Sequence, residues 1–174
     1  DMHIGRLMAY LESIGEYENT IFIFTSDNGA EGSPLINPTA NSVLDPWFER
    51  VGYETGIENL GEKGSWVGIG PSNATVAASP LAYYKFHANE GGLRVPLVMS
   101  GPGISQRGEL SDEFVFVTDL APTILSLVDV NDHGGSWQTR EVERIVGKDF
   151  SSYLQGQAGP IHTAAEPIGY EMGG

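Results

Sequence analysis

Oxygen-bearing side chains directly follow an apolar run near the start of the chain. Residues 21–24 are large and apolar, and Asp27 and Asn28 come just after them. An apolar run without polar alternation predicts a buried strand covered on both faces, as in a parallel α/β sheet. Ligands of such sheets bind at the carboxyl ends of the strands, and carboxylate and amide oxygens suit Ca²⁺ or Mg²⁺. Asp-Asn-Gly is also an ordinary turn sequence, so the residues alone leave both interpretations open.

A second candidate for chemistry is Lys85, which follows two tyrosines and precedes Glu90-Gly91-Gly92. A lysine beside aromatic residues usually lays its stem on apolar surface and keeps its ammonium in water. The functional alternative is that the ammonium stabilises charge that develops on a substrate. We expect the neighbouring His87 and Glu90 to be structural, and Arg94 to pair with a carboxylate.

Composition narrows the class of protein. The chain has 174 residues, of which 40% are hydrophobic, and this would suit one globular domain. A net charge of -14 with only 9 Lys and Arg argues against a nucleic-acid partner. Cysteine is absent, which excludes a disulfide, a thiolate metal site and a cysteine nucleophile. No apolar run predicts a membrane span and no leader is visible, and the sequence leaves localisation open.

The elements that would position these residues can be read from periodicity. Residues 1–15 predict an amphipathic helix that packs on a sheet, with Asp1 as its cap and Gly15 at its end. Residues 96–103 predict a short buried strand that a Gly/Pro turn stops, and a helix should follow a cap at Thr118 or Asp119. Residues 131–148 read as a loop and residues 150–154 as one helical turn.

Residues 33–82 are rich in proline and glycine and show no sustained period, so we predict a long loop over the carboxyl edge of the sheet. Four aromatic residues in it would anchor the loop or line an aromatic pocket, and anchoring is the commoner role. They are Trp47, Phe48, Tyr53 and Trp66.

Two blocks of sequence resemble one enzyme family. Residues 25–32 (TSDNGAEG) look like the second metal-binding motif of the type I sulfatases, in the alkaline phosphatase superfamily. Residues 83–96 (YYKFHANEGGLRVP) are similar to that family's lysine-containing substrate segment. Gly70-Pro71 and residues 77–80 (AASP) resemble its bacterial arylsulfatase branch.

The resemblance implies a fold class, and it also implies which portion of the family's catalytic domain this chain would form. The expected fold is α/β: a partial alkaline-phosphatase/sulfatase-like parallel-sheet sandwich with helices on both faces, incomplete in this chain. Residues 1–174 would then be the C-terminal portion of a sulfatase catalytic domain. Within it, residues 33–82 would form the loop at the active-site edge, and residues 160–174 would start the C-terminal subdomain. Uncovered sheet edges would favour self-association.

The resemblance also implies a function. The expected activity is hydrolysis of a small-molecule sulfate ester, aryl or alkyl, with a formylglycine nucleophile and a divalent cation, Ca²⁺ first and Mg²⁺ second. Asp27 and Asn28 would be metal ligands, and Lys85 would be both substrate-binding and catalytic. Asp119 would be structural, as a helix cap.

The family's nucleophile is not matched in this chain. Cysteine is absent, and Ser100 and Ser136 lack the complete surrounding motif, so the chain by itself is predicted to be inactive. Two alternatives remain. One is a phosphonate monoester or phosphodiester hydrolase of the same superfamily, and the other is a non-catalytic binding module that retains part of the fold.

Overall fold

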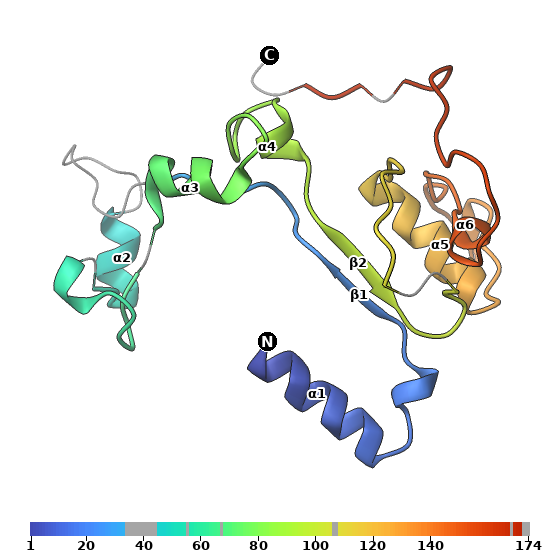
Figure 1. Cartoon of the computed structure of the whole chain (residues 1–174), viewed down its shortest axis with the longest axis horizontal. Coiled ribbons are helices and arrows are strands. Elements are labelled where there is room, and N and C mark those ends of the chain that lie inside the picture. Colours follow the sequence, from blue (N-terminus) through green and yellow to red (C-terminus); the bar gives the residue numbers. More distant parts are fainter. Residues whose placement is uncertain (34–44, 55, 67, 106–107, 168, 172–174) are drawn as a thin grey trace. The chain divides into compact units, whose positions relative to one another are not determined.

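The chain divides into two compact units, and Figure 1 shows its helices and strands coloured along the sequence. The computed structural model describes residues 1–33, 45–54, 56–66, 68–105, 108–167 and 169–171. The first unit comprises Asp1–Phe24 and Val98–Ile168, and the second comprises Thr25–Leu97 and Gly169–Gly174. No helix in these described ranges is long and apolar enough to cross a membrane.

The first unit begins with helix α1 (Met2–Ser13), as the apolar spacing predicted. Gly15 takes a φ of +75°, so the helix ends at a left-handed glycine as expected. Asp1 stands at the N-cap, but its side chain makes no capping hydrogen bond. The apolar side chains of Ile4, Leu7 and Ile14 are exposed, and among the described elements α1 packs only on the short helix η1 (Tyr17–Asn19). The predicted packing of α1 on a sheet is therefore wrong for this chain.

A two-stranded sheet pairs β1 (Phe22–Thr25) with β2 (Leu97–Ser100). Gly101 lies against Thr20, and Gly29 donates its N–H to Gly92 O, so the two strands run antiparallel. Phe24 in β1 is 56% exposed and Val98 in β2 is 57% exposed. The predictions that both faces of β1 are covered and that β2 is buried are therefore wrong here. The physical reason is that two strands alone offer no layer to cover them. The larger parallel-sheet sandwich stays a prediction.

The buried part of the first unit surrounds helix α5 (Leu120–Leu127), which follows the short helix η3 (Val117–Asp119) and packs on α6 (Ser151–Leu154). Pro122 lies in the first turn of α5, where a missing N–H costs nothing. Helix α5 was predicted, as was a helical turn at 150–154, whereas η3 was not. The buried residues of this region are Ile104, Asp119, Thr123, Phe150 and Ser151.

Residues 131–148 are not loop throughout, because β3 (Ser136–Trp137) and β4 (Arg140–Glu141) form a small antiparallel hairpin. Gln138 takes a φ of +55° in the connection. Such a hairpin depends on this left-handed turn residue, and a glutamine gives no sequence signal for it.

The second unit corrects the prediction of a single long loop over residues 33–82. It contains α2 (Asp45–Val51), η2 (Ile57–Asn59) and α3 (Gly70–Ala78), followed by α4 (Glu90–Leu93). Pro71 occupies the first turn of α3, where it favours a helix rather than breaking it. Residues 34–44 of the predicted loop lie outside the described residues.

The four aromatic residues of this region pack on one another. The Trp47 ring centroid lies 5.4 Å from Phe48, 5.6 Å from Tyr53 and 5.8 Å from Trp66. The Trp66 ring also contacts all three of the other rings. Backbone hydrogen bonds between Glu54 and both Gly64 and Trp66 close the segment around the cluster. The rings therefore form a packed cluster within their own segment, and the choice between anchoring the loop and lining a pocket stays a prediction.

Candidate functional site

A hydrogen-bonded turn follows strand β1 and carries the two candidate metal ligands. Ser26 Oγ donates to Asn28 O at 2.9 Å, and Asn28 Nδ2 donates to Gly29 O at 2.9 Å. Asn28 Oδ1 is therefore the side-chain atom left for a ligand. Asp27 is exposed, and no described residue hydrogen-bonds its carboxylate. The segment is thus a turn that also presents two hard oxygen donors.

Glycines let this turn dock closely on α4. Gly29 N–H donates to Gly92 O at 3.0 Å, and a Cβ on Gly29 would lie 1.9 Å from Gly91 O. Gly91 and Gly92 are both buried. Gly91 N–H in turn donates to Ala82 O at 2.8 Å. Backbone contacts that exclude any side chain therefore join the turn of Asp27 to the segment of Lys85.

Lys85 lies against the same turn. Its N–H donates to Ala30 O at 2.9 Å, and its ammonium lies 2.9 Å from Glu31 Oε2. The ammonium is also 5.1 Å from the centre of the Phe86 ring. The Lys85 side chain is 31% exposed, so part of it faces solvent. The structure therefore brings together the two segments that the sequence singled out separately.

Glu31 is the charged partner that the sequence analysis missed. Its Oε1 accepts hydrogen bonds from Ser33 N at 3.0 Å and Ser33 Oγ at 2.8 Å, while Oε2 faces Lys85. Partial burial acts to raise the pKa of Glu31, but the hydrogen bonds from Lys85 and Ser33 outweigh it and hold the pKa below its ordinary value. The only sequence feature that pointed to Glu31 was its position within the motif at residues 25–32.

The other polar residues of this segment make contacts of their own, and Arg94 pairs with a carboxylate, as predicted. The structural roles of His87 and Glu90 stay predictions. The His87 ring stacks on Tyr83 with centroids 4.8 Å apart, and its Nδ1 lies 3.1 Å from Tyr84 O. Arg94 pairs with Glu90, with 3.3 Å between Nη1 and Oε2. Glu90 begins α4 and Arg94 directly follows it, and both side chains are exposed.

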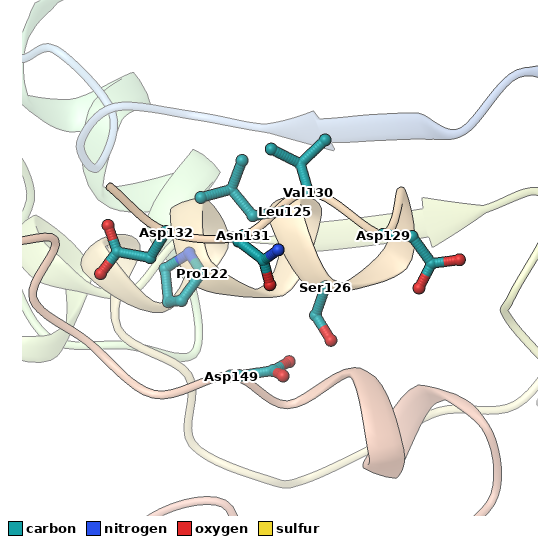
Figure 2. Close-up of a pocket in the computed structure, with 8 residues that line it drawn as sticks. All are labelled: Pro122, Leu125, Ser126, Asp129, Val130, Asn131, Asp132 and Asp149. Carbon is teal, nitrogen blue, oxygen red and sulfur yellow. The ribbon is translucent and has the colours of Figure 1, made fainter. Parts of the chain in front are cut away.

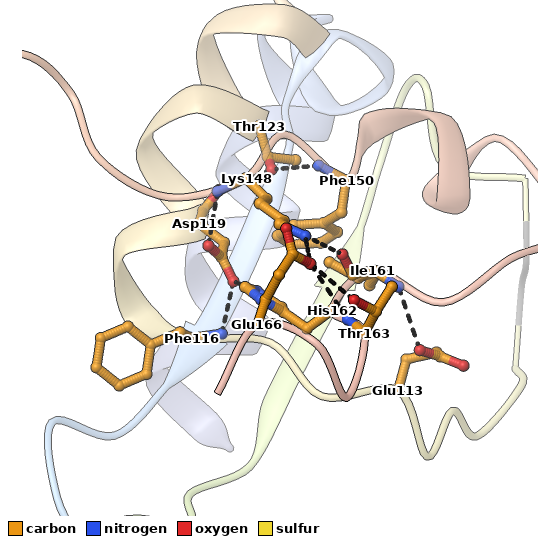
Figure 3. A network of polar contacts seen from close by, with 10 residues as sticks. All are labelled: Glu113, Phe116, Asp119, Thr123, Lys148, Phe150, Ile161, His162, Thr163 and Glu166. Carbon is orange, nitrogen blue, oxygen red and sulfur yellow. Dashed lines mark hydrogen bonds and ion pairs between the residues drawn. The ribbon is translucent and has the colours of Figure 1, made fainter. Parts of the chain in front are cut away.

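The first unit contains a separate polar network around Asp119 (Figure 3). The buried Asp119 carboxylate accepts hydrogen bonds from Phe116 N and Lys148 N, each at 2.7 Å, and lies 2.6 Å from His162 Nε2. Thr123 Oγ1 donates to Asp119 O and accepts from Phe150 N. Burial acts to raise the pKa of Asp119, but these contacts outweigh it and hold the pKa below its ordinary value.

This network supports a structural role for Asp119 and corrects its details. Asp119 occupies the N-cap position of α5, but its side chain makes no capping bond to that helix. The side chain instead accepts a hydrogen bond from Phe116 N, just before η3, and it contacts Lys148 N and His162 Nε2. Lys148 also donates to Glu166 and to Ile161 O, so residues 161–166 are held on the same network.

An acidic pocket lies beside α5 in the same unit (Figure 2). Asp149 faces the helix and accepts a hydrogen bond from Ser151 N at 2.8 Å. Burial acts to raise its pKa, but hydrogen bonds from Ser151 and Ser126 hold it below the ordinary value. Within the described ranges, no group of three or more His, Cys, Asp or Glu residues is placed to hold a metal. The lining residues are Pro122, Leu125, Ser126, Asp129, Val130, Asn131, Asp132 and Asp149.

The donor set at Asp27 and Asn28 fits part of a calcium site. Calcium binds six to eight oxygens in flexible geometry, and carboxylate and amide oxygens are among its usual ligands. The two side chains are adjacent at an exposed turn, with one carboxylate and one amide oxygen available. They can contribute to a cation site, and further oxygens would have to complete it.

Comparison with known proteins identifies the family. The Sulfatase family model matches residues 1–130, so the chain belongs to the sulfatase family, whose fold is α/β of the alkaline-phosphatase type. It is 38% identical over 175 residues to an uncharacterised sulfatase of Schizosaccharomyces pombe, covering 100% of this chain and 31% of that protein. It is 32% identical to an arylsulfatase of Klebsiella aerogenes, over 87% of this chain and 32% of that enzyme.

A mammalian relative is more distant: the chain is 26% identical to the steryl-sulfatase of Mus musculus, over 91% of this chain and 19% of that protein. The chain thus spans at most about a third of the length of these curated relatives.

Proposed function

We propose that the whole protein carrying this chain hydrolyses sulfate esters of small molecules, with aryl and alkyl sulfates as the substrate class. The observation that carries this proposal is family membership over residues 1–130, a range that includes both Asp27 and Lys85. The relatives named arylsulfatase and steryl-sulfatase support the same reaction.

Within this proposal, Asp27 and Asn28 supply two oxygen ligands to a divalent cation, Ca²⁺ first and Mg²⁺ second. A bound cation would polarise a sulfate oxygen and favour attack at sulfur. The ammonium of Lys85 contacts the sulfate and stabilises charge on its oxygens and on the leaving group. The docking of Gly29 on Gly92 fixes the distance between these two segments.

The nucleophile in this proposal is a formylglycine, and the residues of this chain do not fit that role. Cysteine is absent, and no serine lies in the complete modification motif. No residue of this chain is therefore proposed as the nucleophile. The 174-residue chain by itself is expected not to turn over sulfate esters, even with calcium supplied.

The test is to compare the whole protein with its Asp27→Ala variant. We expect lower calcium affinity by titration calorimetry together with slower hydrolysis of 4-nitrophenyl sulfate, because one carboxylate ligand is lost. Asp112→Ala is a matched control, since Asp112 is exposed and its loss changes the net charge equally. Unchanged calcium affinity in Asp27→Ala would remove the metal assignment.

The same assay separates the alternative functions. Bis(4-nitrophenyl) phosphate and a phosphonate monoester, offered at equal concentration, would be the preferred substrates of a hydrolase from the neighbouring branch. A non-catalytic binding module would hydrolyse none of the three.

A further inference from the structure

We propose that Glu31 is the positioning residue of Lys85, and that it directs the ammonium toward the sulfate. This inference rests on the proposed function, because it assigns a partner to the lysine that would contact the substrate. Glu31 itself would not touch the substrate and would act through Lys85.

The two carboxylate oxygens of Glu31 have different partners. Oε1 receives two hydrogen bonds from Ser33, one from the backbone at 3.0 Å and one from the hydroxyl at 2.8 Å. These bonds fix the plane of the carboxylate. Oε2 is then left for Lys85 at 2.9 Å. Since Lys85 N–H also donates to Ala30 O, the lysine is held at both its backbone and its ammonium.

The exposure of the pair argues that it contributes little to stability. The side chains are 31% exposed at Lys85 and 40% exposed at Glu31. Ion pairs this accessible to water are worth little free energy of folding. What the pair does supply is direction, because a lysine ammonium on a four-carbon stem otherwise samples many rotamers.

The N–H groups of the Lys85 ammonium that Glu31 does not use are free to donate hydrogen bonds to a substrate. An ammonium has three N–H groups, and Glu31 occupies one of them. The negative charge of Glu31 acts on the ammonium in the ground state and in the transition state alike. Charge moves onto the leaving-group oxygen only in the transition state, so the direction of the ammonium should affect kcat more than KM.

The experiment measures kcat and KM of the whole protein on 4-nitrophenyl sulfate for Glu31→Ala, Lys85→Ala and the double variant. We expect Glu31→Ala to lower kcat about tenfold, since misplacing a group at a reacting site can cost up to roughly 100-fold. KM should change less than twofold. In the Lys85→Ala background, Glu31→Ala should have no further effect, because its only route to the substrate is gone.

Two further variants separate positioning from folding. Glu31→Gln keeps the shape and an acceptor for Ser33 or Lys85, so it should recover part of the lost kcat. Glu90→Ala breaks the other ion pair of this region, with Arg94, and should leave kcat unchanged. A loss in Glu31→Ala that Glu31→Gln does not relieve at all would overturn the positioning role.

The outcomes distinguish this inference from the proposed function. If Lys85→Ala slows hydrolysis and Glu31→Ala does not, the inference fails and the role of Lys85 stands. If Lys85→Ala has wild-type kcat and KM, the substrate assignment of Lys85 fails and the inference falls with it. Losses that multiply in the double variant would show that Glu31 acts independently of Lys85, which also overturns the inference.

Discussion

At the scale of single residues, the charge and the packing of Lys85 can be separated by mutation. Lys85→Ala should lower kcat/KM. The loss should correspond to about 3 kcal/mol of transition-state stabilisation, the usual cost of removing an electrostatic donor. Lys85→Met keeps most of the stem beside Phe86 but removes the charge. We expect it to lose as much activity as Lys85→Ala while unfolding at the wild-type temperature. A folded Lys85→Ala enzyme with unchanged kcat/KM contradicts the assignment.

Loss of the buried Asp119 carboxylate should destabilise the protein, because the carboxylate accepts hydrogen bonds from two backbone N–H groups. In Asp119→Asn an amide NH₂ replaces one acceptor oxygen and faces Phe116 N–H or Lys148 N–H. The free energy of unfolding should fall by about 3 kcal/mol, because a buried charged acceptor with several donors is lost. Urea unfolding at pH 7 measures this, and Asp112→Asn, on the surface, is the control.

The lowered pKa of Asp119 also predicts a pH dependence. A carboxyl whose pKa is lower in the folded state than its ordinary 3.8 stabilises the protein at neutral pH. This contribution is lost as the pH falls below 3.8 and through the folded-state pKa. The stability difference between the wild type and Asp119→Asn should therefore shrink between pH 5 and pH 2. A difference that stays constant over this range would argue against a charged Asp119 in the folded protein.

At the scale of elements, the docking of the Asp27 turn on α4 depends on Gly29. A Cβ there would lie 1.9 Å from Gly91 O, so Gly29→Ala must displace backbone. We expect a loss of about 3 kcal/mol in the free energy of unfolding, at the upper end for overpacking. Gly5→Ala is the matched control, since a Cβ at Gly5 meets nothing within 4 Å and the site lies in α1. It should stabilise by about 0.5–1 kcal/mol. Equal effects of the two substitutions would contradict the close-approach argument.

At the scale of the whole molecule, the chain exposes apolar side chains on several elements. Leu7 on α1 is 52% exposed, and Val98 on β2 is 57% exposed. Apolar surface and unpaired strand edges favour association, so the isolated chain should form dimers or larger species at micromolar concentration. Light scattering after size-exclusion chromatography measures the mass, and Leu7→Glu should shift it toward the monomer. A monomer at every concentration would refute this prediction.

The sequence by itself determined the features that depend on neighbouring residues. The apolar spacing over residues 2–13 and a glycine at position 15 defined the first helix and its end, because a helix is set by contacts three and four residues apart. The oxygen donors of Asp27 and Asn28 were likewise readable from a strand followed by a turn.

Only the tertiary structure decided which distant segments meet. Glu31 reaches Lys85, and Asp119 reaches His162 across 43 residues, through paths of the chain that no local pattern encodes. The same limit explains the misjudged burial of Phe24, whose apolar character shows that it can be covered but not whether this chain covers it. Local chemistry is thus readable from the order of the residues, whereas pairing and burial depend on where the chain folds back on itself.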